Sequence, residues 1–225
     1  MESYRLEGQT FVIDDYDRKP AFSSFLPGLA GVKGIPLWTF YTNRGQGMNS
    51  FGIDNKGNAI MEFNSANTAF ENTQVKGFRT FLKIDGEYYE PFFTYEKEAK
   101  RQMRMNKNSF KIIETNEKYG IEVTVNYYVL PNESIGALVR QVSVKNIGDS
   151  AKEVQVIDGL PKIITYGIAN GEFKEMSNLF KSWADIRNLE NKVPYYTLRA
   201  STKDSAEVSD VEGGYYYLTV RDGKL

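Results

Sequence analysis

Hydrophobic and polar residues alternate along much of the chain with a period of two. The clearest run covers 121–129, where apolar side chains occupy the odd positions from Ile121 to Val129. Strict alternation predicts a β-strand with one buried and one solvent-facing side. The runs 138–144 and 152–157 continue the pattern after two segments rich in turn-forming residues. We therefore predict an antiparallel meander of three strands over 121–157.

Shorter apolar runs between turn-forming residues predict further strands. The run 78–84 leads into Asp85-Gly86 and then 87–89, which is typical of a type I′ hairpin. The remaining predicted strands are 10–13, 21–25, 36–41, 49–53, 59–63, 110–114, 195–200 and 215–220. More than ten strands with no helices between them favour an all-β fold, a large antiparallel β-sandwich of two sheets.

One segment breaks this pattern, because its apolar residues recur at steps of three and four. This spacing predicts an amphipathic helix over 174–190. Its apolar positions are Met176, Leu179, Phe180, Trp183, Ile186 and Leu189. Two roles stay open: the apolar stripe packs on the sandwich, or Trp183 borders a groove.

The last residues of the chain form an unfinished pattern. A predicted strand over 215–220 runs into Arg221-Asp222-Gly223-Lys224, a strong hairpin turn, and Leu225 follows. The return strand that such a turn joins is missing. We therefore expect residues 1–225 to form a single N-terminal domain, cut from a longer multidomain protein.

The composition excludes several kinds of active site, because the 225 residues include no Cys and no His. Thiolate nucleophiles, zinc ribbons, iron–sulfur clusters and His-dependent catalytic triads are therefore ruled out. Carboxylates, Lys, Tyr, Ser, Thr and Arg remain for chemistry. We expect no metal and no cofactor, and any metal would need hard oxygen ligands.

Charge and hydropathy limit the partners. Lys and Arg number 28 against 29 Asp and Glu, which gives a net charge of −1 without a basic stripe. A nucleic-acid partner is therefore not expected. No apolar run approaches the ~18 residues of a membrane-spanning helix, and the N-terminus lacks the order of a signal peptide. We expect a cytoplasmic protein that does not contact a membrane.

The loop after 36–41 is the first candidate for ligand binding. It contains the polar residues Asn43, Arg44 and Gln46 together with Gly45 and Gly47. Glycine permits positive φ and close approach of a ligand to the backbone, and the polar side chains suit sugar hydroxyls or phosphate. The alternative is a glycine-rich turn whose arginine pairs with a carboxylate.

A carboxylate after the meander is the second candidate. Asp158 either presents its carboxylate at the rim of the sheet or caps the following turn. Asp14, Asp15 and Asp17 lack the spacing of a calcium loop and are interpreted as solvated loop charges.

Several ordered blocks resemble the N-terminal region of glycoside hydrolase family 94 phosphorylases, in particular the 1,2-β-oligoglucan phosphorylases. The stretch 156–162 and the helix containing Trp183 are also similar to that group. The blocks that carry the resemblance are 21–31, 34–47, 50–53, 60–63 and 76–81.

The resemblance implies a galactose-mutarotase-like supersandwich that belongs to a homodimeric enzyme. Such enzymes add phosphate to the anomeric carbon of a β-linked glucooligosaccharide with inversion, while a carboxylic acid on a separate helical barrel protonates the leaving oxygen. This chain matches only the sandwich, so no catalytic residue is carried over, and we expect no catalysis by the chain alone.

The role that the resemblance implies is structural and dimer-forming. Asn43, Arg44, Gln46 and Asp158 are the candidate substrate contacts. The alternative function is a stand-alone carbohydrate-binding sandwich. An aldose-mutarotase-like enzyme is set aside. Enzymes of that kind look to use a His together with a carboxylate, and this chain has no His.

Overall fold

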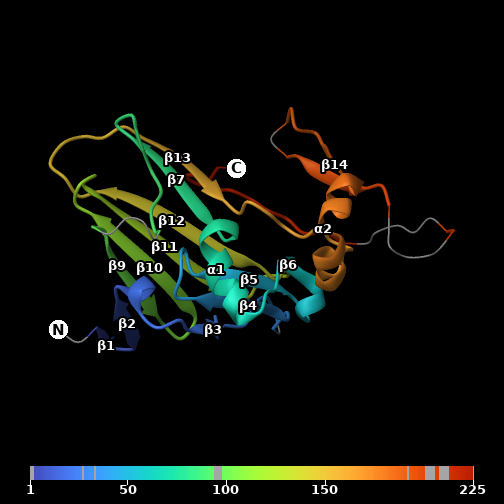
Figure 1. Cartoon of the computed structure of the whole chain (residues 1–225), viewed down its shortest axis with the longest axis horizontal. Coiled ribbons are helices and arrows are strands. Elements are labelled where there is room, and N and C mark those ends of the chain that lie inside the picture. The colour runs from blue at the N-terminus through green and yellow to red at the C-terminus, as the bar shows by residue number, and fades with distance from the viewer. Residues whose placement is uncertain are drawn as a thin grey trace. The chain divides into compact units, whose positions relative to one another are not determined.

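The structure is a computed structural model that describes residues 3–26, 28–32, 34–93, 98–191, 193–200, 206–207 and 213–224. The chain forms two compact units, Met1–Ile163 and Ile164–Leu225. Most regular structure consists of strands in antiparallel sheets, with few helices (Figure 1). The predicted all-β class is confirmed, whereas a single domain over 1–225 stays a prediction.

A six-stranded antiparallel sheet spans the first unit. In β10 (Ser109–Asn116) and β11 (Ile121–Val129) every second side chain is buried, as the alternating sequence predicts. The predicted strand 121–129 is confirmed with its bounds. In spatial order the strands are β1 (Tyr4–Glu7), β2 (Thr10–Asp14), β9 (Lys100–Met105), β10 (Ser109–Asn116), β11 (Ile121–Val129) and β12 (Leu138–Asn146).

Two smaller sheets complete the first unit. One has the order β13 (Val154–Gly159), β7 (Arg79–Ile84) and β8 (Glu87–Tyr89), and the other contains β3 (Ser23–Phe25), β4 (Leu37–Thr42), β5 (Met48–Ile53) and β6 (Ala59–Met61). The β7–β8 hairpin is confirmed, since Asp85 and Gly86 have φ of 49° and 93°.

The predicted meander is wrong in its third strand. β12 pairs with β11 as expected, but β13 leaves that sheet and pairs antiparallel with β7 (Figure 1). An alternating pattern identifies a strand and its buried side, but it carries no information about which neighbour the strand will pair with.

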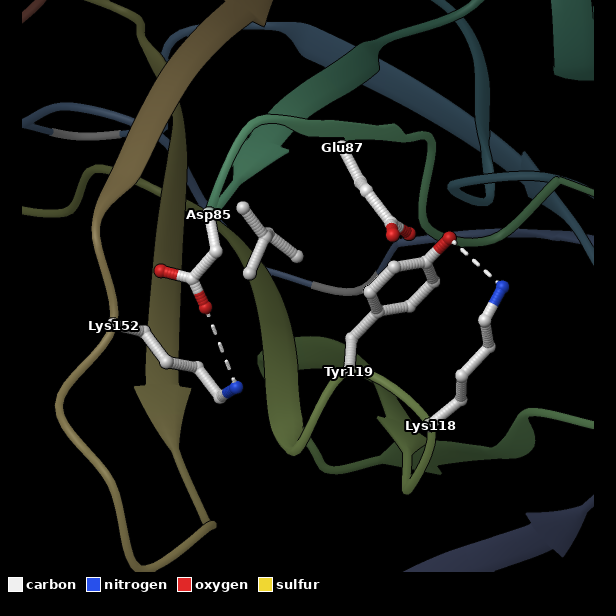
Figure 2. Close-up of a pocket in the computed structure, with 6 residues that line it drawn as sticks. Asp85, Glu87, Lys118, Tyr119 and Lys152 are labelled. Atoms are coloured by element: carbon white, nitrogen blue, oxygen red, sulfur yellow. Dashed lines mark hydrogen bonds and ion pairs between the residues drawn. The ribbon is translucent and has the colours of Figure 1, made fainter.

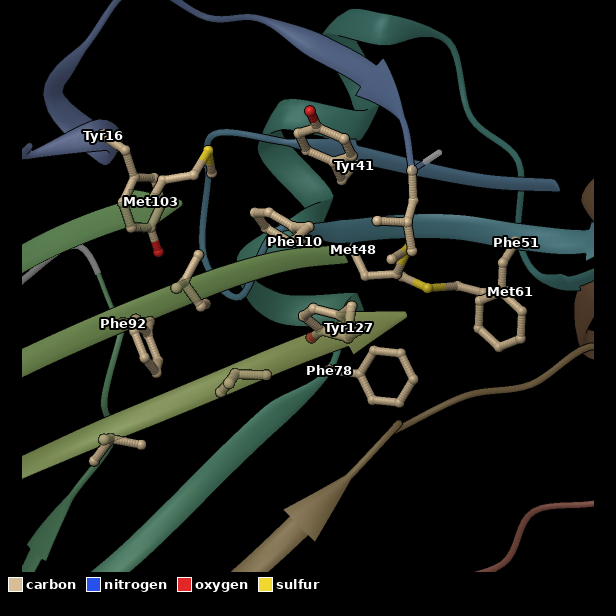
Figure 3. Packing of buried hydrophobic residues seen from close by; sticks show 14 of the residues in the cluster. Tyr16, Tyr41, Met48, Phe51, Met61, Phe78, Phe92, Met103, Phe110 and Tyr127 are labelled. Carbon is tan, nitrogen blue, oxygen red and sulfur yellow. The ribbon is translucent and has the colours of Figure 1, made fainter. Parts of the chain in front are cut away.

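Aromatic side chains from different sheets meet in one core. The Tyr41 ring of β4 stacks on Phe110 of β10 with centroids 4.6 Å apart, and Phe110 stacks on Tyr127 of β11 at 5.5 Å. Phe78, which precedes β7, packs on Tyr127 at 5.9 Å (Figure 3). Contacts of this kind bury large rings from all three sheets together, so the sheets form one packed body around a shared core.

Helices interrupt the strands of the first unit more than the sequence predicted. Short 3₁₀ turns occur at Tyr16–Arg18 and Lys56–Asn58. The helix α1 (Ala66–Lys76) contacts β4 and β5, although we predicted no helix between strands. Its sequence ANTAFENTQVK has no continuous apolar stripe, which explains why periodicity did not reveal it.

The second unit contains the predicted helix with different bounds. α2 runs over Asn170–Trp183, and the chain then forms β14 (Ala184–Arg187), which pairs with β15 (Tyr195–Leu198). The predicted helical stretch after 183 is therefore wrong. The segment 215–220 has no strand, although the turn at Asp222-Gly223 is present. Among the described residues, no helix has both the length and the apolarity to cross a membrane.

Candidate functional site

The candidate loop after β4 points its first amide into the protein. Asn43 is fully buried, and its Oδ1 accepts a hydrogen bond of 2.9 Å from the Phe22 backbone N–H. Its Nδ2 donates to the carbonyls of Tyr16 at 2.9 Å and Pro20 at 3.0 Å. Asn43 therefore ties β4 to the segment between the 3₁₀ turn and β3.

Arg44 also binds carbonyl groups of its own chain. Its guanidinium donates to the carbonyl of Asn43 at 2.8 Å and to that of Lys19 at 3.2 Å. Gly47 has the positive φ expected of this loop, 83°. A Cβ at Gly47 would lie 2.3 Å from Phe110 Cζ, so the group that approaches the backbone is a core ring.

Gln46 and Asp158, which are far apart in the sequence, belong to one polar network. Gln46 Nε2 donates to Thr80 Oγ1 at 3.0 Å, and Thr80 Oγ1 donates to Asp158 Oδ1 at 2.6 Å. Arg140 of β12 donates to Gln46 Oε1, to Asp158 Oδ2 and, at 3.1 Å, to the hydroxyl of Tyr127. These five residues form what we call the Arg140 network.

The Arg140 network is mostly buried and holds its charge. The Arg140 side chain is 7% exposed, and its guanidinium lies 5.0 Å from the centroid of the Phe78 ring. Burial by itself lowers the pKa of Arg140, but Tyr127 and Asp158 outweigh it, so the pKa is raised. The Asp158 side chain is 26% exposed, and it is the member through which the network can receive a hydrogen bond from a ligand hydroxyl.

Sequence reasoning did not single out Arg140 or Thr80. The sequence did contain one signal for Arg140. In the alternating run 138–144 it lies on the same side of the strand as the apolar residues Leu138 and Val142. A charged residue at an inward position of a strand needs a buried partner. The partner itself, Asp158, lies on a different sheet.

A second buried polar group, the buried ion group, consists of Asp17, Arg101 and Glu114. Arg101 Nε lies 2.6 Å from Glu114 Oε2, and Arg101 Nη1 lies 2.6 Å from Asp17 Oδ2. Glu114 also accepts hydrogen bonds from the Tyr89 hydroxyl and, at 2.7 Å, from the Phe92 N–H. The interpretation of Asp17 as a solvated charge is wrong, because its side chain is buried beside Arg101.

The buried ion group is a fixed arrangement of charges. Burial lowers the pKa of Arg101, but Glu114 and Asp17 more than offset this effect, so the pKa is raised. Burial, followed by the charge of Glu114, raises the pKa of Tyr89. Arg101 therefore stays charged and Tyr89 stays neutral at neutral pH, which suits a structural role better than proton transfer.

Neither polar group resembles a metal site. In the part of the chain that the structure describes, no three Asp, Glu, His or Cys side chains come together in a way that could hold a metal ion.

Among known proteins, no family model matches the chain, and a search of curated proteins finds no significant match.

Proposed function

We propose that the chain is the N-terminal β-sandwich of a carbohydrate-active inverting phosphorylase that acts on β-linked glucooligosaccharides. The sandwich takes the galactose-mutarotase-like form that the sequence resemblance implies. Its role is to support the catalytic part and to form a homodimer contact. Phosphate and the sugar bind to the parent enzyme, and the chain alone is not catalytic.

The observation that carries the supporting role is the use of the candidate polar side chains inside the fold. Both donors of the Asn43 amide bind carbonyl groups of the segment 16–20, and two donors of the Arg44 guanidinium bind the carbonyls of Asn43 and Lys19. Gln46 is buried between Thr80 and Arg140. Side chains whose hydrogen bonds are satisfied internally stabilise a scaffold and have little left to offer a substrate.

The first test uses the coding sequence around this chain and the protein that it encodes. A helical barrel encoded in the same frame, with phosphate-dependent release of α-glucose 1-phosphate from β-1,2-glucooligosaccharides, is the expected result. The 225-residue chain by itself should give no turnover. A stop codon directly after Leu225, or turnover by the chain alone, would contradict the proposal.

The second test separates a scaffold from a substrate contact at Asp158. Asp158→Asn removes the negative partner of the buried Arg140 guanidinium, so we expect a loss of about 2 kcal/mol in unfolding free energy. KM for the oligosaccharide should stay unchanged in the full-length enzyme. Asp149→Asn, at an exposed loop position, is the matched control. A raised KM with unchanged stability would instead make Asp158 a substrate contact.

A row of aromatic rings favours the second candidate, a stand-alone carbohydrate-binding sandwich. Phe25 of β3 is exposed, and its ring centroid lies 5.1 Å from that of Phe40. Trp38 and Phe40 of β4 both contact the ring of Phe63, at 5.7 Å and 6.3 Å between centroids. Trp38 and Phe40 are only partly buried, and partly exposed rings in a row can stack against successive sugar rings.

Calorimetry on the chain tests this second candidate. It predicts an affinity that grows with the number of glucose units and is lost in Trp38→Ala. Trp183→Ala, which removes the other tryptophan from the second unit, is the control and should bind normally. Absence of any length-dependent affinity would exclude this function.

A further inference from the structure

A small polar pocket lies at the tip of the β7–β8 hairpin, away from the Arg140 network. It has a volume of about 210 Å³. The hairpin, the turn between β10 and β11, and the segment before β13 contribute its walls. The residues that line it are Ile84, Asp85, Glu87, Lys118, Tyr119 and Lys152 (Figure 2). This volume is below the ~300 Å³ at which drug-sized ligand sites begin, so the pocket suits a single small ring.

The charged side chains of the pocket balance one another. Two ammonium groups, of Lys118 and Lys152, face two carboxylates, of Asp85 and Glu87. An anion such as phosphate would gain from the lysines and lose against the carboxylates. The formal charge of zero therefore favours a neutral polar ligand.

The pair formed by Lys152 and Asp85 leaves room for a bridging group. Lys152 Nζ lies 3.7 Å from Asp85 Oδ2, which is too long for a direct hydrogen bond, although only 16% of the lysine side chain is exposed. A polar gap of this size is commonly filled by a group that accepts from one side and donates to the other. A hydroxyl group does both, whereas a fully ionised phosphate oxygen only accepts.

Tyr119 gives the pocket a rigid wall. In Figure 2 its ring lies between the Asp85–Lys152 pair and the side chains of Glu87 and Lys118. The ring packs on Tyr89 with centroids 4.6 Å apart, and the Tyr89 hydroxyl donates to the buried Glu114. The buried ion group therefore fixes the position of Tyr119, and a wall that is already ordered costs less entropy when a ligand binds.

Glu87 supplies the remaining polar group. Within the described residues its carboxylate has no hydrogen-bond or ion-pair partner, and Figure 2 shows it directed towards the Tyr119 hydroxyl. A carboxylate with free lone pairs readily accepts from a ligand hydroxyl. Donors and acceptors thus alternate around an aromatic side chain.

We propose that this pocket binds one ring of a neutral carbohydrate. A ring hydroxyl bridges Lys152 and Asp85, a second hydroxyl donates to Glu87, and the ring packs beside Tyr119. The inference rests on the proposed function only for the choice of glucose as the sugar. The size of the ligand and its contacts follow from the pocket itself.

The experiment is calorimetric titration of the chain with glucose, with the β-1,2-linked disaccharide of glucose, and with inorganic phosphate. We expect both sugars to bind with similar affinity and phosphate not to compete. Lys152→Met keeps the aliphatic stem but removes the donor, and it should weaken sugar binding about 10-fold or more, as loss of a charge-assisted hydrogen bond does. Lys145→Met, at an exposed position of β12, is the matched control and should bind normally.

Two further variants keep the outcome interpretable. Tyr119→Phe should bind almost as well as the native chain, whereas Tyr119→Ala should not, with circular dichroism confirming that each is folded. Lack of sugar binding by the native chain, or competition by phosphate, overturns the proposal. If a full-length protein bound glucose at this pocket but showed no phosphorolysis, the proposed function would be refuted and the pocket proposal would be supported. If it showed phosphorolysis but bound no sugar at this pocket, the pocket proposal would be refuted and the proposed function would be supported.

Discussion

Substitution of Arg101 by methionine is the sharpest test of how the first unit is stabilised. Methionine has a similar unbranched stem but no charge and no donors. It would leave the carboxylates of Asp17 and Glu114 in place, both buried, without the cation that lies 2.6 Å from each. The carbonyl of Phe93, which accepts from Arg101 Nη2 at 2.7 Å, would lose its donor too.

The size of the effect follows from burial. The Arg101 and Glu114 side chains are 2% and 1% exposed, so solvent cannot replace the lost partner. Removal of one member of a buried ion pair costs about 3–5 kcal/mol. Because Arg101 serves two carboxylates and a carbonyl, we expect a loss of about 4–5 kcal/mol, a large part of the ~5–15 kcal/mol that stabilises a typical domain.

Urea unfolding measures this loss. The chain has two tryptophans, so a Trp183→Phe background leaves Trp38 as the fluorescent reporter for the first unit. Arg104→Met is the control, because Arg104 lies on the same strand but pairs with Glu7 at the surface, where an ion pair contributes little. If Arg101→Met were no more destabilising than Arg104→Met, the reasoning from burial would be refuted.

A double variant examines the coupling. Glu114→Gln keeps an acceptor for the Phe92 N–H but removes the negative charge that Arg101→Met would leave buried without a partner. The sum of the losses in unfolding free energy of the two single variants should therefore exceed the loss of the double variant by about 1 kcal/mol or more. Strictly additive losses would mean that Arg101 and Glu114 stabilise the fold independently.

Two other predictions concern pH and backbone conformation. Burial raises the pKa of Tyr16 and of Tyr89 above the value of 10.0 expected in the unfolded chain, so their contribution to stability is complete below about pH 10 and is lost as the pH rises beyond it. An ultraviolet titration should show these tyrosines ionising only as the chain unfolds, and ionisation in the folded state would contradict this. Gly47→Ala and Gly86→Ala both place alanine at positive φ, which costs about 1–2 kcal/mol, but only the former overlaps Phe110. Thermal denaturation should therefore show the larger loss for Gly47→Ala, and equal losses would rule out the overlap as a cause.

The sequence predicted strands best where one side of the strand is uniformly apolar. β11 and the β7–β8 hairpin follow directly from alternation and from Asp85-Gly86. β9 was missed because Arg101 occupies an inward position, so its run does not alternate as an apolar strand should. The charge is tolerated there because Glu114 of the neighbouring strand and Asp17 neutralise it, and the local sequence pattern does not reveal these partners.

Sites were harder to predict than strands, for a related reason. The loop residue Asn43 has the chemistry of a ligand contact, but its Nδ2 donates to carbonyls, and its Oδ1 accepts from a backbone N–H, more than twenty residues earlier in the chain. The pocket at the hairpin combines Asp85, Tyr119 and Lys152, each unremarkable within its own segment. Only the pairing of distant strands brings such side chains together.

Folding of the first unit has to wait for residues that are made late. β7 is the central strand of its sheet, and its second partner, β13, follows only after the whole β8–β12 region. Contacts so distant in sequence raise the contact order and slow folding, because a long loop must close before the contacts form. On the ribosome, β7 therefore emerges with one edge unpaired, and nascent chains are most exposed to edge-to-edge aggregation during the interval before β13 is synthesised.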